Sequence, residues 1–137
     1  MNRSGYTDDY DDADPLELGR WRGQVAAAIR GRRGQEFLRE LADAMDAMDE
    51  KVLIVDELID AQGDCCAIGV VCRARGIDVS NIDIECPTSV GNAVGISHQL
   101  AAEIEYLNDL WPRETPERRW QRMRRWVESK IKKGGDS

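Results

Sequence analysis

Cysteine and histidine are the residues of this chain that could bind a metal ion or carry out redox chemistry. Three of the four cysteines, Cys65, Cys66 and Cys72, fall within eight positions, the fourth is Cys86, and the single histidine is His98. Zinc sites use four such ligands, usually with cysteine pairs two to four residues apart. Here the successive cysteines are 1, 6 and 14 residues apart, and no C-x-x-C redox motif is present. This pattern predicts neither a metal site nor a redox site.

The residues around these cysteines indicate a buried helix instead. Positions 65 to 72 carry no charged side chain on any face, and a helix that is apolar all round is typical of a protein core. Arg73 and Arg75, followed by Gly76, are the residues expected in the last turn and at the end of a helix. Reduced cysteine packs like a small hydrophobic residue. We therefore expect residues 64–75 to form a central buried helix with its cysteines in the core.

The sequence contains no recognisable catalytic constellation. His98 has no partner nucleophile in a known motif such as G-x-S-x-G. We predict that the protein is not an enzyme, has no catalytic or metal-binding residue and needs no cofactor. The opposing hypothesis is a metal-dependent enzyme built on Cys65, Cys66, Cys72 and His98. Elemental analysis that finds no stoichiometric zinc or iron would remove it.

Helical periodicity runs through most of the chain. Apolar stripes at three- and four-residue spacing extend from Trp21 to Ile29 and from Phe37 to Met48. A third stripe follows Thr115, an expected N-cap, and Pro116 at the first helical position. We predict an all-α fold, a compact single-domain bundle of about five to seven helices around the central helix. The domain is expected to span residues 15–133, with a flexible acidic arm at residues 1–14 and a disordered tail at residues 134–137.

Two segments allow more than one interpretation. Residues 51–60 follow Asp49, a possible N-cap, but Val52 to Val55 is also a run typical of a short strand. We favour a helix, because no second strand is evident to pair with it. The apolar residues of 77–84 form either an extended edge or a turn that docks them on the core; they are Ile77, Val79, Ile82 and Ile84.

Residues 87–109 approximate a helix-turn-helix motif. Pro87 begins the first helix, Gly91 lies inside it, and Gly95 occupies the turn. The surface expected to face outward on the second helix carries no Lys or Arg and at least two carboxylates, so DNA phosphates would be repelled. Its members are Ser97, His98, Gln99, Ala102, Glu103, Tyr106, Glu105, Asn108 and Asp109. We interpret the motif as a structural helix pair.

Charge is distributed unevenly along the sequence. Residues 113–137 hold nine Lys or Arg and four acidic residues, whereas the whole chain has a net charge of −7. Such asymmetry predicts oriented contact with a partner or pairing between the protein's own faces, and a merely solvated basic helix is an equal alternative. From expected exposure we select five candidate partner-binding residues, which are Glu103, Asp109, Arg118, Arg122 and Arg125.

The chain has no apolar run near the roughly 18–20 residues that cross a membrane. Its first residues do not read as a secretory signal or a transit peptide. We therefore expect a cytoplasmic protein without membrane contact. The three tryptophans Trp111, Trp120 and Trp126 either close the core or lie in a dimer interface. A homodimer is therefore one of the alternatives that the sequence allows.

Residues 35–131 contain a C-A-[IL]-G core followed by R-A-R-G-[IV]-D, a Y-x-N-D that ends at Asp109, and the closing "ETPERRWQRMRRWV". In these motifs the chain resembles a family of small, mostly uncharacterised proteins encoded by bacteriophages and prophages. It brings no catalytic residue with it. It implies a phage-related protein in a bacterial host cell, and small acidic phage proteins often bind and block a host protein.

Two functional hypotheses follow. The favoured one is a non-enzymatic protein–protein interaction module, an anti-CRISPR-like inhibitor or modulator of a host defence complex. The alternative is a nucleic-acid-binding regulator that uses the basic residues from Arg118 to Lys133.

Overall fold

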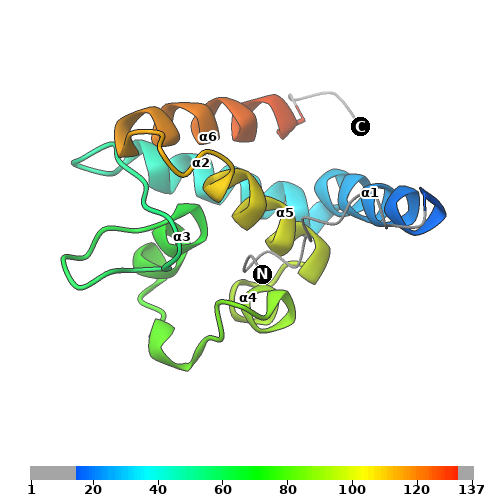
Figure 1. Cartoon of the computed structure of the whole chain (residues 1–137), viewed down its shortest axis with the longest axis horizontal. Helices are drawn as coiled ribbons and strands as arrows, with labels where there is room; N and C mark the ends of the chain where they lie inside the picture. Colours follow the sequence, from blue (N-terminus) through cyan, green and yellow to red (C-terminus); the bar gives the residue numbers. More distant parts are fainter. Residues whose placement is uncertain (1–14, 133–137) are drawn as a thin grey trace.

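The computed structural model describes residues 15–132, which form six α-helices and one short 3₁₀ helix and contain no strand. In chain order these are α1 (Pro15–Arg30), α2 (Arg32–Asp46), α3 (Ala67–Arg75), η2 (Val79–Asn81), α4 (Pro87–Val94), α5 (His98–Asp109) and α6 (Pro116–Lys130). Figure 1 shows α6 along one side of the molecule and α4 at the opposite side. The predicted all-α fold of five to seven helices is confirmed. The expected acidic arm, residues 1–14, and the expected tail, residues 134–137, lie outside the described residues.

The core is built around α3, as the uncharged run from residue 65 to residue 72 predicts. All eight of these residues are buried, and the exposed fraction of Cys65, Cys66 and Cys72 is at most 1%. The helix ends at Gly76, which adopts the left-handed conformation with φ 72°. Its first helical residue is Ala67 rather than residue 64, because the backbone of Cys66 is extended. The cysteines are therefore core residues, and only the start of the predicted helix was misplaced.

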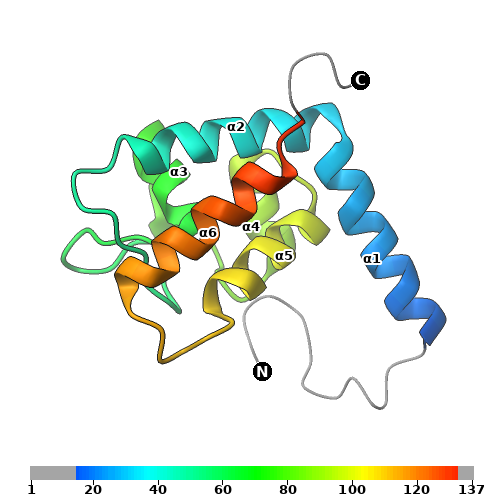
Figure 2. The ribbon, with the colours of Figure 1, turned by 90° about the horizontal axis from the view of Figure 1, so that it is seen from above.

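Gly31 separates α1 from α2, and the two helices then cross closely. A Cβ atom on Gly34 would lie 1.9 Å from the carbonyl oxygen of Ala28, so this crossing requires a glycine. The buried Gln35 side chain donates to the carbonyls of Ile29 (2.7 Å) and Lys130 (2.9 Å). Gln35 thereby joins the ends of α1 and α6 to the start of α2, and Figure 2 shows these three ends meeting.

Residues 47–66 connect α2 to α3 without a helix, so the favoured helix at residues 51–60 was wrong. The backbone N–H of Leu53 donates to the carbonyl of Pro116 (3.1 Å), and that of Ile54 donates to Cys65 (2.9 Å). A single antiparallel bridge pairs Ile59 with Cys65. These amides thus bond to distant segments rather than to a helical neighbour. Leu53 and Leu58 are buried at 0% and 2% exposure, so contacts across the core override the local preference.

The expected helix pair is formed by α4 and α5. Gly95 ends α4 in the left-handed conformation, and Ser97 caps α5 by accepting from the N–H of Leu100 at 3.1 Å. A Cβ atom on Gly91 would lie 2.7 Å from the carbonyl oxygen of Ile96, so the tight turn depends on a small residue inside the first helix.

Before α4, residues 77–84 make a turn around η2 rather than an extended edge. Four apolar residues of this turn pack partly buried against the core; they are Ile77, Val79, Ile82 and Ile84. Of the two interpretations open for this segment, the docked turn is the one observed. No helix within residues 15–132 has the length and apolar character needed to cross a membrane.

Candidate interaction surface

Helix α6 carries most of the basic residues and begins as the sequence predicts. Thr115 accepts from the N–H of Arg118 at 3.2 Å, and Pro116 occupies the first helical position. Met123 and Val127 are fully buried, and the predicted inward stripe is completed by Trp120, Trp126 and Ile131, which are partly buried. Trp111, by contrast, is 57% exposed, so two of the three tryptophans help to close the core.

Arg119 lies on the same inward face and is only 2% exposed. Its guanidinium donates to the carbonyls of Asn108 (3.0 Å), Leu53 (3.1 Å), Trp111 (2.9 Å) and Glu114 (3.1 Å). Burial lowers the pKa of Arg119, and these carbonyl dipoles stabilise the positive charge. Arg119 therefore holds the 47–66 loop and the α5–α6 connection against α6.

Two further arginines of α6 are engaged within the protein. Arg122 donates to the carboxylate of Glu114 (2.8 Å) and to the carbonyl of Leu107 (2.6 Å). Through this hydrogen bond Arg122 holds the pKa of Glu114 below its usual value. Arg124 pairs with Asp46 on α2 at 2.9 Å and with Glu128 at 3.0 Å. The expected exposure of Arg122 is thus corrected, because its side chain is 21% exposed and its charge is neutralised.

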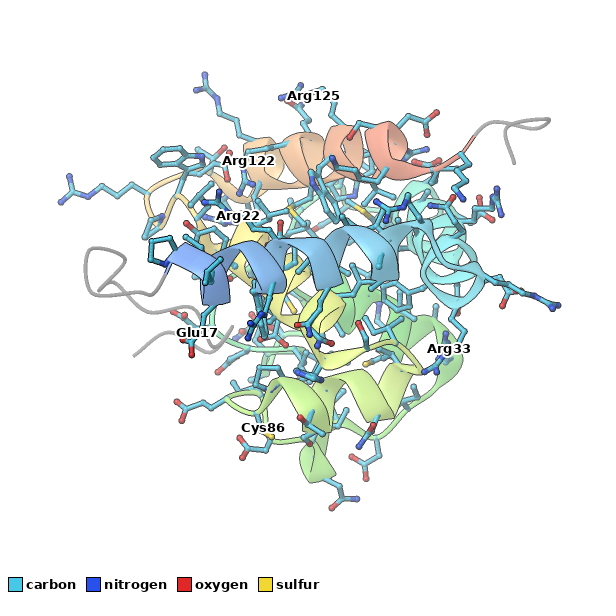
Figure 3. The ribbon with its side chains drawn as sticks, turned by 90° about the vertical axis from the view of Figure 1, so that its right-hand side faces the viewer. Glu17, Arg22, Arg33, Cys86, Arg122 and Arg125 are labelled. Carbon is cyan, nitrogen blue, oxygen red and sulfur yellow. The ribbon has the colours of Figure 1, made fainter. Side chains whose placement is uncertain are left out.

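Arg118 and Arg125 are the exposed members of the predicted set on α6. They are seven residues apart and so lie on one face of the helix. Neither forms an ion pair within residues 15–132. Figure 3 shows Arg125 at the outer surface of α6, whereas Arg122 lies lower, toward the body of the protein.

The two acidic candidates are on α5 and do not join this face of α6. Glu103 is half-buried and lines a groove beside α1, and Asp109 accepts from the amide of Asn108 at 2.8 Å near the end of the helix. Asn108 is buried, accepts from the N–H of Ala67 and donates to the carbonyl of Ile54. Glu105 and Ala102 are also buried, so the expected outward placement of these three residues was wrong.

The groove beside Glu103 runs between α1, α5 and α6 and has a volume of about 490 Å³. Its lining combines apolar, aromatic and basic side chains; these are Leu18, Arg22, Val25, Ala26, Ile29, Glu103, Tyr106, Trp126 and Lys130. The exposed Arg22 and Lys130 have no carboxylate partner among the described residues. In Figure 3, Arg22 lies on the side of α1 that is nearer to α6. The sequence could not show this groove, because nothing in it indicates that α1 lies beside the end of α6.

The strongest acidic stretch, residues 43–64, contains eight carboxylates and one lysine. Lys51 is exposed, and its ammonium donates to the carbonyls of Asp46 and Met48 and lies 5.8 Å from the centre of the Trp120 ring. Six of the carboxylates belong to exposed residues, which are Asp43, Asp46, Asp49, Glu50, Asp56 and Glu57. In Figure 2 the connection that carries most of this acidic segment lies at the end of the molecule opposite α1.

Comparison with known proteins identifies no relative. No family model matches the sequence, and no curated protein or solved structure is significantly similar to the chain.

The cysteines of the core and His98, the residues considered above for metal or thiol chemistry, pack against other side chains in the structure. Burial raises the pKa of Cys65 and of Cys72 to about 11, so both thiols are protonated at neutral pH. His98 is exposed at the start of α5, and its ring lies edge-on to Trp21 with the ring centres 6.0 Å apart. Within residues 15–132, no group of three or more His, Cys, Asp or Glu residues is arranged to hold a metal ion.

Proposed function

We propose that this protein is a non-enzymatic protein–protein interaction module that docks on a partner through the acidic end formed by residues 43–64. The observation that supports the proposal is the separation of charge on a well-packed helical body. The exposed carboxylates of residues 43–64 lie at one end, and Arg22 and Lys130, which form no ion pair within residues 15–132, border the groove beside α1 at the other. Separated charges of this kind orient an approaching protein and raise its association rate.

The partner we propose is a protein of a bacterial host, such as a defence complex whose action the module inhibits. The resemblance to phage-encoded proteins supports the host as the source of the partner. The acidic end has the charge needed to occupy a basic surface that normally binds nucleic acid. Arg118 and Arg125 then contribute to orientation during docking.

Nucleic-acid binding through α6 receives less support from the geometry. Phosphate contacts need free cationic side chains along one face. Arg119, Arg122 and Arg124 are committed to carbonyls and carboxylates of the protein itself. Of the basic side chains of α6, Arg118, Arg125 and Lys130 are exposed without a carboxylate partner within residues 15–132, and Lys130 borders the groove beside α1.

Affinity capture from a bacterial host lysate tests the proposal, run with and without nuclease at low and moderate salt. We expect one host protein or complex to survive nuclease and to be lost when Glu50, Asp56 and Glu57 are replaced by Gln, Asn and Gln. The matched control replaces Glu36, Asp78 and Asp83, exposed carboxylates outside residues 43–64, with Gln, Asn and Asn, and should retain the partner. Capture that disappears with nuclease would overturn the proposal in favour of nucleic-acid binding.

A further inference from the structure

We propose that the groove between α1, α5 and α6 binds the acidic N-terminal segment of this same chain, residues 1–14. The proposal concerns a different surface from the acidic end discussed above and does not depend on the identity of any external partner. It rests on three features of the described residues: the chemistry of the groove, its position beside α1, and the distance that the segment must cover.

The groove offers apolar contact and two positive side chains, which outnumber the single carboxylate of its lining, Glu103. Its floor is formed by apolar side chains of α1 together with the rings of Tyr106 and Trp126. Arg22 on α1 and Lys130 on α6 border it, and both are exposed without a carboxylate partner in residues 15–132. A ligand that matches this lining carries several carboxylates and a few aromatic side chains. Arginine and lysine next to aromatic rings favour such ligands through ionic and stacking contacts.

The sequence of residues 1–14, "MNRSGYTDDYDDAD", has this composition. It contains five aspartates, two tyrosines and one arginine, which gives it a net charge of −4. The excess of negative charge in this segment complements the two positive side chains beside the groove. Residues 43–64 are also acidic, but they pack on the core at the end of the molecule opposite the groove and so cannot occupy it.

The segment is also long enough and attached at the right place. It joins the first residue of α1, Pro15, and the groove begins at Leu18, within the first turn of that helix. From Leu18 to Ile29 the helix advances about 17 Å, a distance that about five or six extended residues cover. Fourteen residues can therefore turn back along α1 and reach Lys130. Because the segment is tethered beside its site, its effective concentration there is of millimolar order.

Carboxyl-to-amine crosslinking with a zero-length carbodiimide tests the proposal on the full chain. Among residues 15–132, Lys130 is the one lysine that lines the groove, and Lys51 at the acidic end serves as the internal control. We expect mass spectrometry to find residues 1–14 joined to Lys130 within monomeric protein. The yield should fall several-fold in about 1 M salt, where charges are screened beyond about 3 Å.

Two charge reversals at exposed arginines separate the groove from the rest of the basic surface. Arg22→Glu should reduce the crosslink to Lys130 several-fold, whereas Arg118→Glu, on the outer face of α6, should leave it unchanged. Equal yields in the two variants, equal crosslinking to Lys51, or no crosslink to Lys130 would each overturn the proposal. A crosslink confined to dimeric protein would assign the segment to the groove of a second copy and would overturn binding within one chain.

A second measurement avoids chemical modification. Replacing the five aspartates of residues 1–14 with asparagine leaves the core untouched, so the variant should fold like the parent. We expect amide NMR signals to shift along α1, at Glu103 and Tyr106, and around Trp126, while those of the 47–66 loop stay in place. Identical spectra outside the substituted segment would contradict binding in the groove.

Discussion

Arg119 stabilises the fold through hydrogen bonds to backbone carbonyls of the segments packed around α6. It donates to four of them and is 2% exposed, so replacement by methionine removes four hydrogen bonds, of which those to Asn108 and Leu53 are buried. Each unsatisfied buried group costs about 1–3 kcal/mol, so we expect Arg119→Met to lower the free energy of unfolding by about 3 kcal/mol or more. Urea unfolding measures the loss. Arg118→Met, at an exposed position, is the matched control and should change stability by less than about 0.5 kcal/mol.

Glu114 gives the stability of the protein a dependence on pH. Its pKa is held below the ordinary value of 4.5, first of all by the hydrogen bond from Arg122. The ionised carboxylate therefore stabilises the folded state above the unfolded pKa, and this contribution is lost as pH falls through the lower folded pKa. We expect Glu114→Gln to destabilise the protein by about 1–3 kcal/mol at pH 7, and the difference from the parent should shrink as the pH falls below 4.5 and through the lower folded pKa.

Urea unfolding across this pH range provides the check, with Glu117→Gln as its control. Glu117 is exposed in the first turn of α6 and forms no ion pair within residues 15–132. Its replacement should cost no more than about 1 kcal/mol through the helix dipole. A difference between parent and Glu114→Gln that stays constant down to low pH would contradict the role assigned to the Arg122 pair.

At the scale of elements, the packing of α3 against the 47–66 loop depends on Gly69. A Cβ atom there would lie 1.8 Å from the carbonyl oxygen of Leu58, which is backbone and cannot rotate away. We expect Gly69→Ala to destabilise the protein by about 2–3 kcal/mol through overpacking. Gly23 on α1 has open space at the same atom, so Gly23→Ala should stabilise by about 0.5–1 kcal/mol through helix propensity. Thermal unfolding of the two variants should shift the midpoint in opposite directions.

The elements predicted from sequence are those whose signals are local. The caps at Thr115 and Gly76 and the uncharged run around Cys65 fix helix ends and burial within a few residues. The conformation of residues 51–60 is not determined by local signals of this kind. The backbone N–H of Leu53 donates to the carbonyl of Pro116, and that of Ile54 donates to the carbonyl of Cys65. Partners more than ten residues away cannot be read from local periodicity, and a helix was predicted where a loop is found.

The same reason explains which candidate binding residues were placed well. Arg118 and Arg125 lie on the outward face of α6, and helical spacing alone separates them from Met123 and Val127. Arg122 is bound by Glu114 in the connection before α6, and that contact depends on how the chain turns. Arg119 did leave a signal, because it stands four residues before Met123 on the apolar stripe. A charged residue at such a position indicates a buried, bonded side chain rather than a binding surface.

At the scale of the whole molecule, the charge distribution predicts weak binding to DNA. The chain has a net charge of −7, and its cationic side chains are divided between the interior and scattered exposed positions. Non-specific DNA binding with a Kd of about 10⁻⁴–10⁻⁶ M draws on several phosphate contacts. We therefore expect fluorescence anisotropy with a labelled duplex to show no saturable binding up to about 100 μM protein at about 150 mM salt.

A titration of the double variant Arg118→Glu with Arg125→Glu completes this test. Residual binding to DNA at low salt should decrease in the variant, because these two arginines are the exposed pair on the face of α6. Micromolar binding at physiological salt that the variant abolishes would contradict the prediction. Such a result would mean that two arginines on one helix, helped by basic residues of α1, outweigh the repulsion from the acidic end. If neither the parent nor the double variant binds DNA, the result agrees with the prediction, and a protein surface is then the target that fits this charge distribution.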